Sequence, residues 1–264
     1  MLLRTLLFST IVLFMGLWFS ACQLTPVEET KFPDPFDQIS DVEARSVLKQ
    51  AMEAMGGLER WQHKQEIRFH KTYDLLLENG EVEAHASQDH VYAYDPEPNI
   101  QISWEEAGQA HLLQQQAGHT QQLVEGQADT SADLSRLTNT ILSATFVANL
   151  PYNLLDPSAD IRYAGLDTLE SGESVHAVRI AYHPDSHANH STPDIWHVFF
   201  DQQRYHLLAY QVQHADHYSY VQNLSDTIVE GFRLVKDRNS WRVDSLGNKL
   251  YLRARYAYAG YVVE

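Results

Sequence analysis

The feature that most constrains this chain is the alternation of apolar and polar residues in many separate segments. In the first segment, residues 67–77, one face is apolar and the other polar; the apolar face carries Ile67, Phe69, Tyr73, Leu75 and Leu77. A period of two residues predicts β-strands with one buried face. The Asn79-Gly80 dipeptide favours a tight hairpin, so the stretch through Tyr94 should return antiparallel. Similar alternation at residues 100–104, 176–182, 196–200, 208–212 and 250–258 predicts one antiparallel sheet or barrel.

Two segments have helical spacing instead. The first begins at Ser40, where Ser40-Asp41-Val42-Glu43 matches a capping box, and it should end at Gly56-Gly57. The second runs from Ser131 to Ala148, with Ser131 or Thr130 as its cap, and Leu150-Pro151 closes it. Each carries an apolar stripe that needs a surface to cover. The predicted fold class is therefore mainly β (α+β), with two helices capping the sheet.

The N-terminal segment predicts an address in the bacterial envelope. Residues 1–21 contain a single arginine, an apolar run and small residues before Cys22, which are the three parts of a secretory signal peptide. Phe19-Ser20-Ala21-Cys22 resembles the lipobox of bacterial lipoproteins, which implies that the mature chain begins at a diacylated, N-acylated Cys22. The alternatives are an uncleaved membrane anchor and an ordinary signal peptide with an incidental cysteine. The apolar run is short for a spanning helix, which needs ~20 residues.

Residues 22–38 should form a lipidated tether, since prolines and acidic residues dominate them. Gln23 follows the cysteine where an aspartate would signal retention in the inner membrane. We therefore expect a lipid anchor in the outer membrane, with the domain over residues 39–264 facing the periplasm. The membrane, reached through Cys22, is the first predicted partner.

Charge and motifs exclude several functions. The formal net charge of −16, from 35 acidic and 19 basic residues, argues against nucleic acid as a partner. The sequence has no nucleophile elbow, zincin helix, phosphate loop or dinucleotide glycine pattern. We expect no cofactor and no enzymatic activity, although a glycosidase-like carboxylate pair is defined in space and not by spacing.

Three short segments carry a resemblance. These are residues 54–61 ahead of a strand, Leu150-Pro151-Tyr152 with Leu155-Asp156 after a helix, and the hairpin from 198–201 to 207–208. They resemble a family of bacterial lipoproteins that is distantly similar to the LolA/LolB-like lipoprotein carriers. The resemblance spans residues 42–260 and implies an unclosed antiparallel β-barrel, or strongly curved sheet, capped by helices around an apolar cavity. It brings no catalytic residues. The chain departs from the soluble carriers in having its own anchor.

Such a barrel must fill its concave side with side chains, a helix or a ligand. Barrel mouths are preferred ligand sites, so we expect an apolar or acyl-bearing small molecule or lipid to bind there. The candidate lining residues are aromatic: Trp61, Phe69, Trp104, Phe146, Tyr152, Trp196 and Phe199. Each is equally suited to a packed core. The alternative is a structural or interaction lipoprotein whose barrel is filled by its own side chains.

Histidines supply a third interpretation. His183, His187 and His190 share a proline-bounded loop, and His197 follows it. Imidazole is a ligand for zinc or copper, so a metal-binding loop is the third interpretation. The spacing matches no recognised metal site, and a solvated polar loop is the favoured interpretation.

Overall fold

The computed structural model describes residues 34–182 and 194–264. The helices in these ranges are η1 (Pro35–Gln38), α1 (Val42–Ala54), α2 (Leu58–Gln62), α3 (Leu134–Ala148) and η2 (Tyr152–Leu154). The strands before α3 are β1 (Glu66–Leu76), β2 (Val82–Ala93), β3 (Asn99–Glu106), β4 (Gln109–Gln116), β5 (His119–Val124) and β6 (Gln127–Ala128). Those after it are β7 (Ala159–Thr168), β8 (Ser174–Tyr182), β9 (Ile195–Asp201), β10 (Leu207–Gln213), β11 (Tyr218–Val229), β12 (Phe232–Val243) and β13 (Lys249–Val263).

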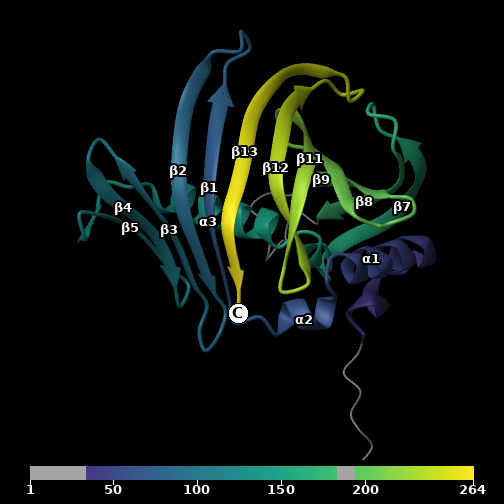
Figure 1. Ribbon diagram of the computed structural model, residues 1–264, viewed down its shortest axis with the longest axis horizontal. Helices are drawn as coiled ribbons and strands as arrows, with labels where there is room; N and C mark the ends of the chain where they lie inside the picture. Colours follow the sequence, from purple (N-terminus) through teal and green to yellow (C-terminus); the bar gives the residue numbers. More distant parts are fainter. Residues whose placement is uncertain (1–33, 183–193) are drawn as a thin grey trace, which may run out of the picture. The chain divides into compact units, whose positions relative to one another are not determined.

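Within the described ranges, all 13 strands form one sheet in the order β6-β5-β4-β3-β2-β1-β13-β12-β11-β10-β9-β8-β7. Each neighbouring pair is antiparallel, and β13 joins the two halves by pairing with both β1 and β12. The sheet ends at β6 and β7 and is not closed. Figure 1 shows α3 crossing one face of this sheet. The predicted fold class, an unclosed antiparallel β-structure with helices, is therefore confirmed.

The hairpin expected at Asn79-Gly80 is present, since β1 and β2 pair antiparallel from Glu66 opposite Ala93 to Leu76 opposite Val82. Asn79 Oδ1 accepts a hydrogen bond from the Glu81 amide, and Gly80 has a φ of +86°. Positive φ at this position is what the dipeptide tolerates. The turn sequence therefore sets the register of the first two strands.

Both helices begin at an aspartate and not at the residues expected from the sequence. Asp41 caps α1 by accepting a hydrogen bond from the Ala44 amide, so the Ser40 cap was wrong. Asp133 caps α3 through the amides of Ser135 and Arg136, so Ser131 and Thr130 were wrong too. An ionised carboxylate satisfies the exposed amides and also opposes the positive end of the helix dipole.

Gly56 explains why α1 ends where it does. It has a φ of +125°, and a Cβ placed there would lie 2.6 Å from Phe232 Cδ1 and 2.9 Å from the Gly231 carbonyl oxygen. The chain can therefore pass the start of β12 only with glycine. It then forms α2, a helix that the sequence analysis did not predict.

The core lies mainly between the helices and one face of the sheet. It includes Phe36 of η1 as well as apolar residues of α1, α2, α3 and most strands. A smaller cluster, Leu169, Val175, Ala177, Phe199 and Ala209, is separate from this core. Among the described helices, none combines the length and the apolar content that crossing a bilayer requires.

Candidate functional site

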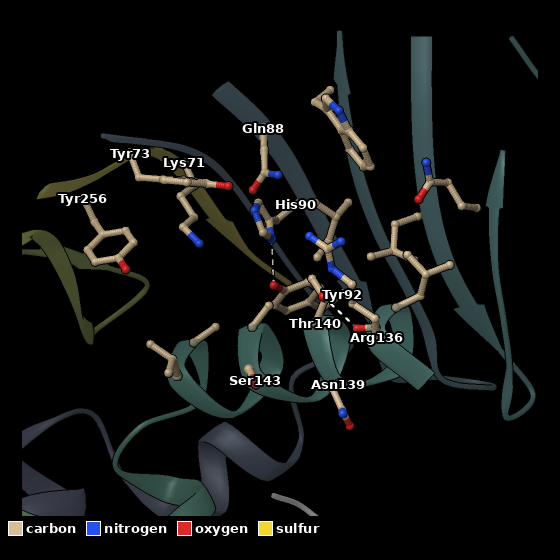
Figure 2. A pocket seen from close by; sticks show the side chains of 18 of the residues that line it. Lys71, Tyr73, Gln88, His90, Tyr92, Arg136, Asn139, Thr140, Ser143 and Tyr256 are labelled. Carbon is tan, nitrogen blue, oxygen red and sulfur yellow. Dashed lines mark hydrogen bonds between the residues drawn. The ribbon is translucent and has the colours of Figure 1, made fainter. Parts of the chain in front are cut away.

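A cavity of about 1140 Å³ lies between α3 and the sheet. Ligand pockets usually measure about 300–1,000 Å³, so this cavity has room for a ligand. Residues from β1, β2, β3, β4, β5, β10, β11, β12 and β13 form its sheet wall, and α3 with the residues before it forms the opposite wall. Figure 2 shows the two walls facing each other, with β1, β2 and β13 side chains above Arg136, Asn139, Thr140 and Ser143 of α3.

Much of the wall is apolar or aromatic. On the sheet side Phe69 and Tyr92 meet at 5.5 Å between ring centroids, edge to face. On the helix side Leu137, Ala144 and Val147 line the cavity beside polar residues of α3, while Ile102 and Leu113 add apolar surface on the sheet side. The alternation of β1 to β3 sends every second side chain to this face. An apolar surface of this kind favours an apolar ligand body.

Three cations line the cavity: Arg136 of α3, which is exposed, and Lys71 and Arg238 on the sheet wall. Lys71 lies on β1 between Phe69 and Tyr73, with its Nζ 4.9 Å from the Tyr73 ring centroid and 5.3 Å from that of Tyr256. Arg238 lies on β12 and is only 5 % exposed. Its Nη1 donates a hydrogen bond to Tyr210 Oη at 3.3 Å, and its guanidinium lies 4.9 Å from the Tyr258 ring centroid.

Burial controls the protonation of the groups around these cations. It lowers the pKa of Lys71 to about 8, with a further decrease from the charge of Arg238. Burial, followed by the charges of Lys71 and His70, lowers the pKa of His90 to about 3, so this imidazole is neutral at physiological pH. His90 stacks on Phe69 at 4.8 Å and hydrogen-bonds through Nδ1 with Tyr92 Oη at 2.7 Å. Arg238 stays charged because the guanidinium does not deprotonate in proteins.

Phe69 and Trp104 are the two sequence-predicted aromatic residues that line the cavity. Phe69 is buried, whereas Trp104 is half-buried, stacks on His111 at 5.0 Å and donates from Nε1 to Glu106 Oε2 at 3.3 Å. Both come from strands whose alternation is regular, and that alternation turns them toward the same face of the sheet.

The other five predicted lining residues are buried in the packed interior and are not among the residues that line this cavity. Trp61 stacks on Tyr152 at 4.7 Å and donates from Nε1 to Asn149 Oδ1 at 3.1 Å. Phe146 packs against Trp196 at 5.0 Å and does not line the cavity. Phe199 belongs to the smaller cluster. Aromatic residues fill a core as readily as they line a pocket, and periodicity does not distinguish the two.

Lys71 and Arg238 were not among the predicted site residues. A signal for Lys71 was present in the sequence, because it stands at the one charged position of the inward set Ile67, Phe69, Lys71, Tyr73 and Leu75. A charge on an otherwise apolar strand face is uncommon in a packed core. Arg238 had a weaker signal, since bulges shift the register of β12 against both neighbours.

The proposed lipid attachment residue, Cys22, and the histidines His183, His187 and His190 lie outside the described residues. His197 lies on β9, where burial and the charge of Arg179 lower its pKa. In residues 34–182 and 194–264, no group of three His, Cys, Asp or Glu side chains has a metal-binding arrangement.

Comparison with known proteins shows the fold. No protein-family model and no curated protein sequence matches this chain. Among solved structures, it is similar to a DUF1329 family protein from Desulfovibrio piger, with a TM-score of 0.52, 10% identity and coverage of 83% of this chain and 92% of that one. It is also similar to a LolA superfamily protein from Nitrosomonas europaea (TM-score 0.50, 5% identity, coverage 83% and 92%).

A third similar structure is a putative outer membrane lipoprotein-sorting protein domain from Vibrio parahaemolyticus, with a TM-score of 0.51, 9% identity and coverage of 83% and 91%. The expected similarity to LolA-like proteins is thereby confirmed at the level of fold. Identities of 5–10% carry no ligand or residue role from these proteins to this chain.

Proposed function

We propose that this chain is a non-enzymatic envelope lipoprotein that binds an apolar or acyl-bearing ligand in the cavity between α3 and the sheet. The observation that carries the proposal is the cavity itself, about 1140 Å³, with aromatic and aliphatic side chains on the sheet wall and aliphatic side chains on the α3 wall. Burying apolar ligand surface against such walls contributes ~25 cal/mol per Å² before the entropic cost of binding. The similar fold of a lipoprotein-sorting domain supports a role of this kind.

The competing interpretation is a structural lipoprotein whose barrel is filled by its own side chains. The large aromatic residues that would fill such a barrel, including Trp61, Phe146 and Trp196, instead pack outside the cavity lining. The volume that they leave favours a binding role.

Ligand binding is tested by uptake of N-phenyl-1-naphthylamine, a neutral apolar fluorophore. A matched pair of variants locates the site. Ala144→Phe adds an aromatic ring to the α3 wall of the cavity, whereas Ala110→Phe adds the same ring at an exposed position on β4 that is not part of the wall. We expect the parent and Ala110→Phe to bind the fluorophore and Ala144→Phe to bind it several-fold more weakly. Absence of uptake by the folded parent would contradict the proposal. Native mass spectrometry of protein extracted gently from its own membrane identifies the ligand that co-purifies.

The lipid anchor is tested separately. Cys22→Ser removes the thiol that would carry the acyl chains, and stable membrane association needs more than one chain. We expect the variant to leave the membrane fraction and to lose the lipid mass. Retention in the membrane with normal processing would contradict the lipoprotein assignment without affecting the cavity.

A further inference from the structure

Lys71 and Arg238 place two positive charges on the same wall of the cavity. β13 runs between their strands, with Lys71 opposite Tyr258 in the β1–β13 pairing and Arg238 opposite Tyr256 in the β12–β13 pairing. The charge of Arg238 is near enough to lower the pKa of Lys71. Figure 2 shows the Lys71 amine between Tyr256 and His90, directed toward α3. The wall thus holds a pair of like charges that repel each other.

Neither cation forms an ion pair with a carboxylate in the described ranges of the chain. Arg238 Nε is buried and has no hydrogen-bond partner among these residues. Burying a charge is unfavourable unless it is paired. A chain with 35 acidic residues had many carboxylates that could have been placed here, so the missing counter-ion is a specific property of the cavity.

The acidic residues that line the cavity are engaged elsewhere. Glu106 is exposed and accepts the Trp104 hydrogen bond, Asp129 accepts hydrogen bonds from Ser131, and Asp133 caps α3. Glu106 and Asp133 are exposed and Asp129 is half-buried, and none of the three forms an ion pair with Lys71 or Arg238.

Tyrosine hydroxyls surround the cations and can donate hydrogen bonds to an anion. Burial raises the pKa of Tyr210, Tyr256 and Tyr258, so their hydroxyls remain protonated at neutral pH. Tyr210 Oη already accepts from Arg238 and therefore keeps its own hydrogen for another acceptor. Arginine, lysine and hydroxyl donors are the groups that recognise carboxylates and phosphates.

We propose that the ligand is an amphipathic anion, whose carboxylate or phosphate group binds between Lys71 and Arg238 while its apolar chain lies along the wall of Phe69, Ile102 and Leu113. This inference rests on the proposed function, because it names the chemistry of the ligand in the same cavity. The bound anion supplies the counter-ion that the described residues do not provide. It also accepts hydrogen bonds from Arg238 Nε and from the tyrosine hydroxyls.

The test measures displacement of N-phenyl-1-naphthylamine from the full mature protein by matched pairs of ligands. Palmitate is compared with hexadecanol, which has the same chain length and no charge. Palmitoyl lysophosphatidate is compared with monopalmitoylglycerol, which lacks only the phosphate. A charged hydrogen-bonded group contributes about tenfold to hundredfold in affinity. We expect at least one anion to bind at least tenfold more tightly than its neutral partner, and the pair that discriminates identifies a carboxylate or a phosphate.

Variants assign that discrimination to the two cations. Lys71→Met and Arg238→Met should reduce the preference for the anion about tenfold each while leaving the affinity for the neutral partner within about twofold. Arg238→Lys should retain part of the preference. The controls Lys236→Met and Arg204→Gln remove exposed charges and should change nothing.

Three outcomes would overturn the inference. If both anions bind the parent protein no more tightly than their neutral partners do, the cations have no role in recognition. The proposed function would still stand, and this comparison needs no variant. The same holds if the preference survives in folded Lys71→Met and Arg238→Met. If no apolar molecule binds the parent, the proposed function fails as well.

Discussion

Replacing Lys71 by methionine should make the free protein more stable. Burial, with the charge of Arg238, lowers the pKa of Lys71 from 10.5 to about 8. At about 1.36 kcal/mol for each pKa unit, the charged amine destabilises the folded state by about 3 kcal/mol at neutral pH. Opposing this are the contacts of the amine with the rings of Tyr73 and Tyr256, each contributing about 0.5–1 kcal/mol. Methionine keeps an unbranched apolar stem of similar length, so we expect the free energy of unfolding to rise by about 1–2 kcal/mol.

The pH dependence of this gain identifies its cause. The folded pKa is below the unfolded pKa, so the unfolded chain binds the proton first as the pH falls from 10.5. The destabilisation therefore builds up between pH 10.5 and about 8 and is constant at lower pH. Urea unfolding followed by tryptophan fluorescence at pH 7 and pH 10 measures the difference. Lys71→Met should be more stable at pH 7 and lose most of its advantage at pH 10. The exposed Lys236→Met is the matched control. A variant that is less stable than the parent at pH 7, or equally improved at both pH values, would refute the reasoning.

Three further predictions concern binding and the helices. Affinity for an anionic ligand should fall as the pH rises through about 8, where Lys71 loses its proton, while neutral ligands should bind equally across the range. Displacement titrations from pH 6 to 10 measure this affinity, and Lys71→Met should abolish its pH dependence. Phe146→Ala should reduce the free energy of unfolding by about 3–5 kcal/mol, because Phe146 is 1 % exposed and packs against Trp196. Fluorophore uptake should nevertheless persist in the folded variant. A loss of uptake without a loss of stability would place Phe146 in the binding site. Asp41→Asn should lose about 0.3–1 kcal/mol at pH 7, because it removes a negative charge from the start of α1, and hydrogen bonds from Ala44 and Tyr163 lower the pKa of Asp41 and favour its ionised form; this difference should vanish as the pH falls below the Asp41 pKa, and equal stability of the two proteins at pH 7 in urea titrations would contradict it.

Sequence predicted the strands whose alternation is uninterrupted. β1, β3, β8, β9 and β10 all contain segments identified by their period of two. β4 and β5 were not identified, because polar residues such as Gln114, Gln115 and Gln121 occupy most of their positions and leave few apolar residues to reveal a face. β11 and β12 were missed for another reason: bulges near Ser225 and Ser240 shift the register and break the period.

The cavity was harder to predict than the sheet. A helix that covers one face decides which inward-facing side chains touch a ligand and which are sealed in the core, and this depends on contacts between residues far apart in the chain. Trp61 illustrates the difficulty, since its partner Asn149 lies 88 positions away. The helix caps show the same dependence, because Asp41 is held by β7 as well as by α1. Local spacing favoured Ser40 as the N-cap of α1, whereas a hydrogen bond from a distant strand favours Asp41 in that position.

The bond from the Tyr163 amide to Asp41 has a consequence for solubility. An unclosed sheet has two free edges, and the unpaired amides of an edge strand can recruit a strand from another molecule, which leads to aggregation. β6 limits this at one edge by being two residues long. At the other edge, β7 carries a bulge between Tyr163 and Gly165 and the charged pair Asp160 and Arg162. The Tyr163 amide on this edge donates a hydrogen bond to Asp41 Oδ2 and so is not free to pair with another strand. The residue that starts the first long helix therefore also prevents a foreign strand from extending the sheet.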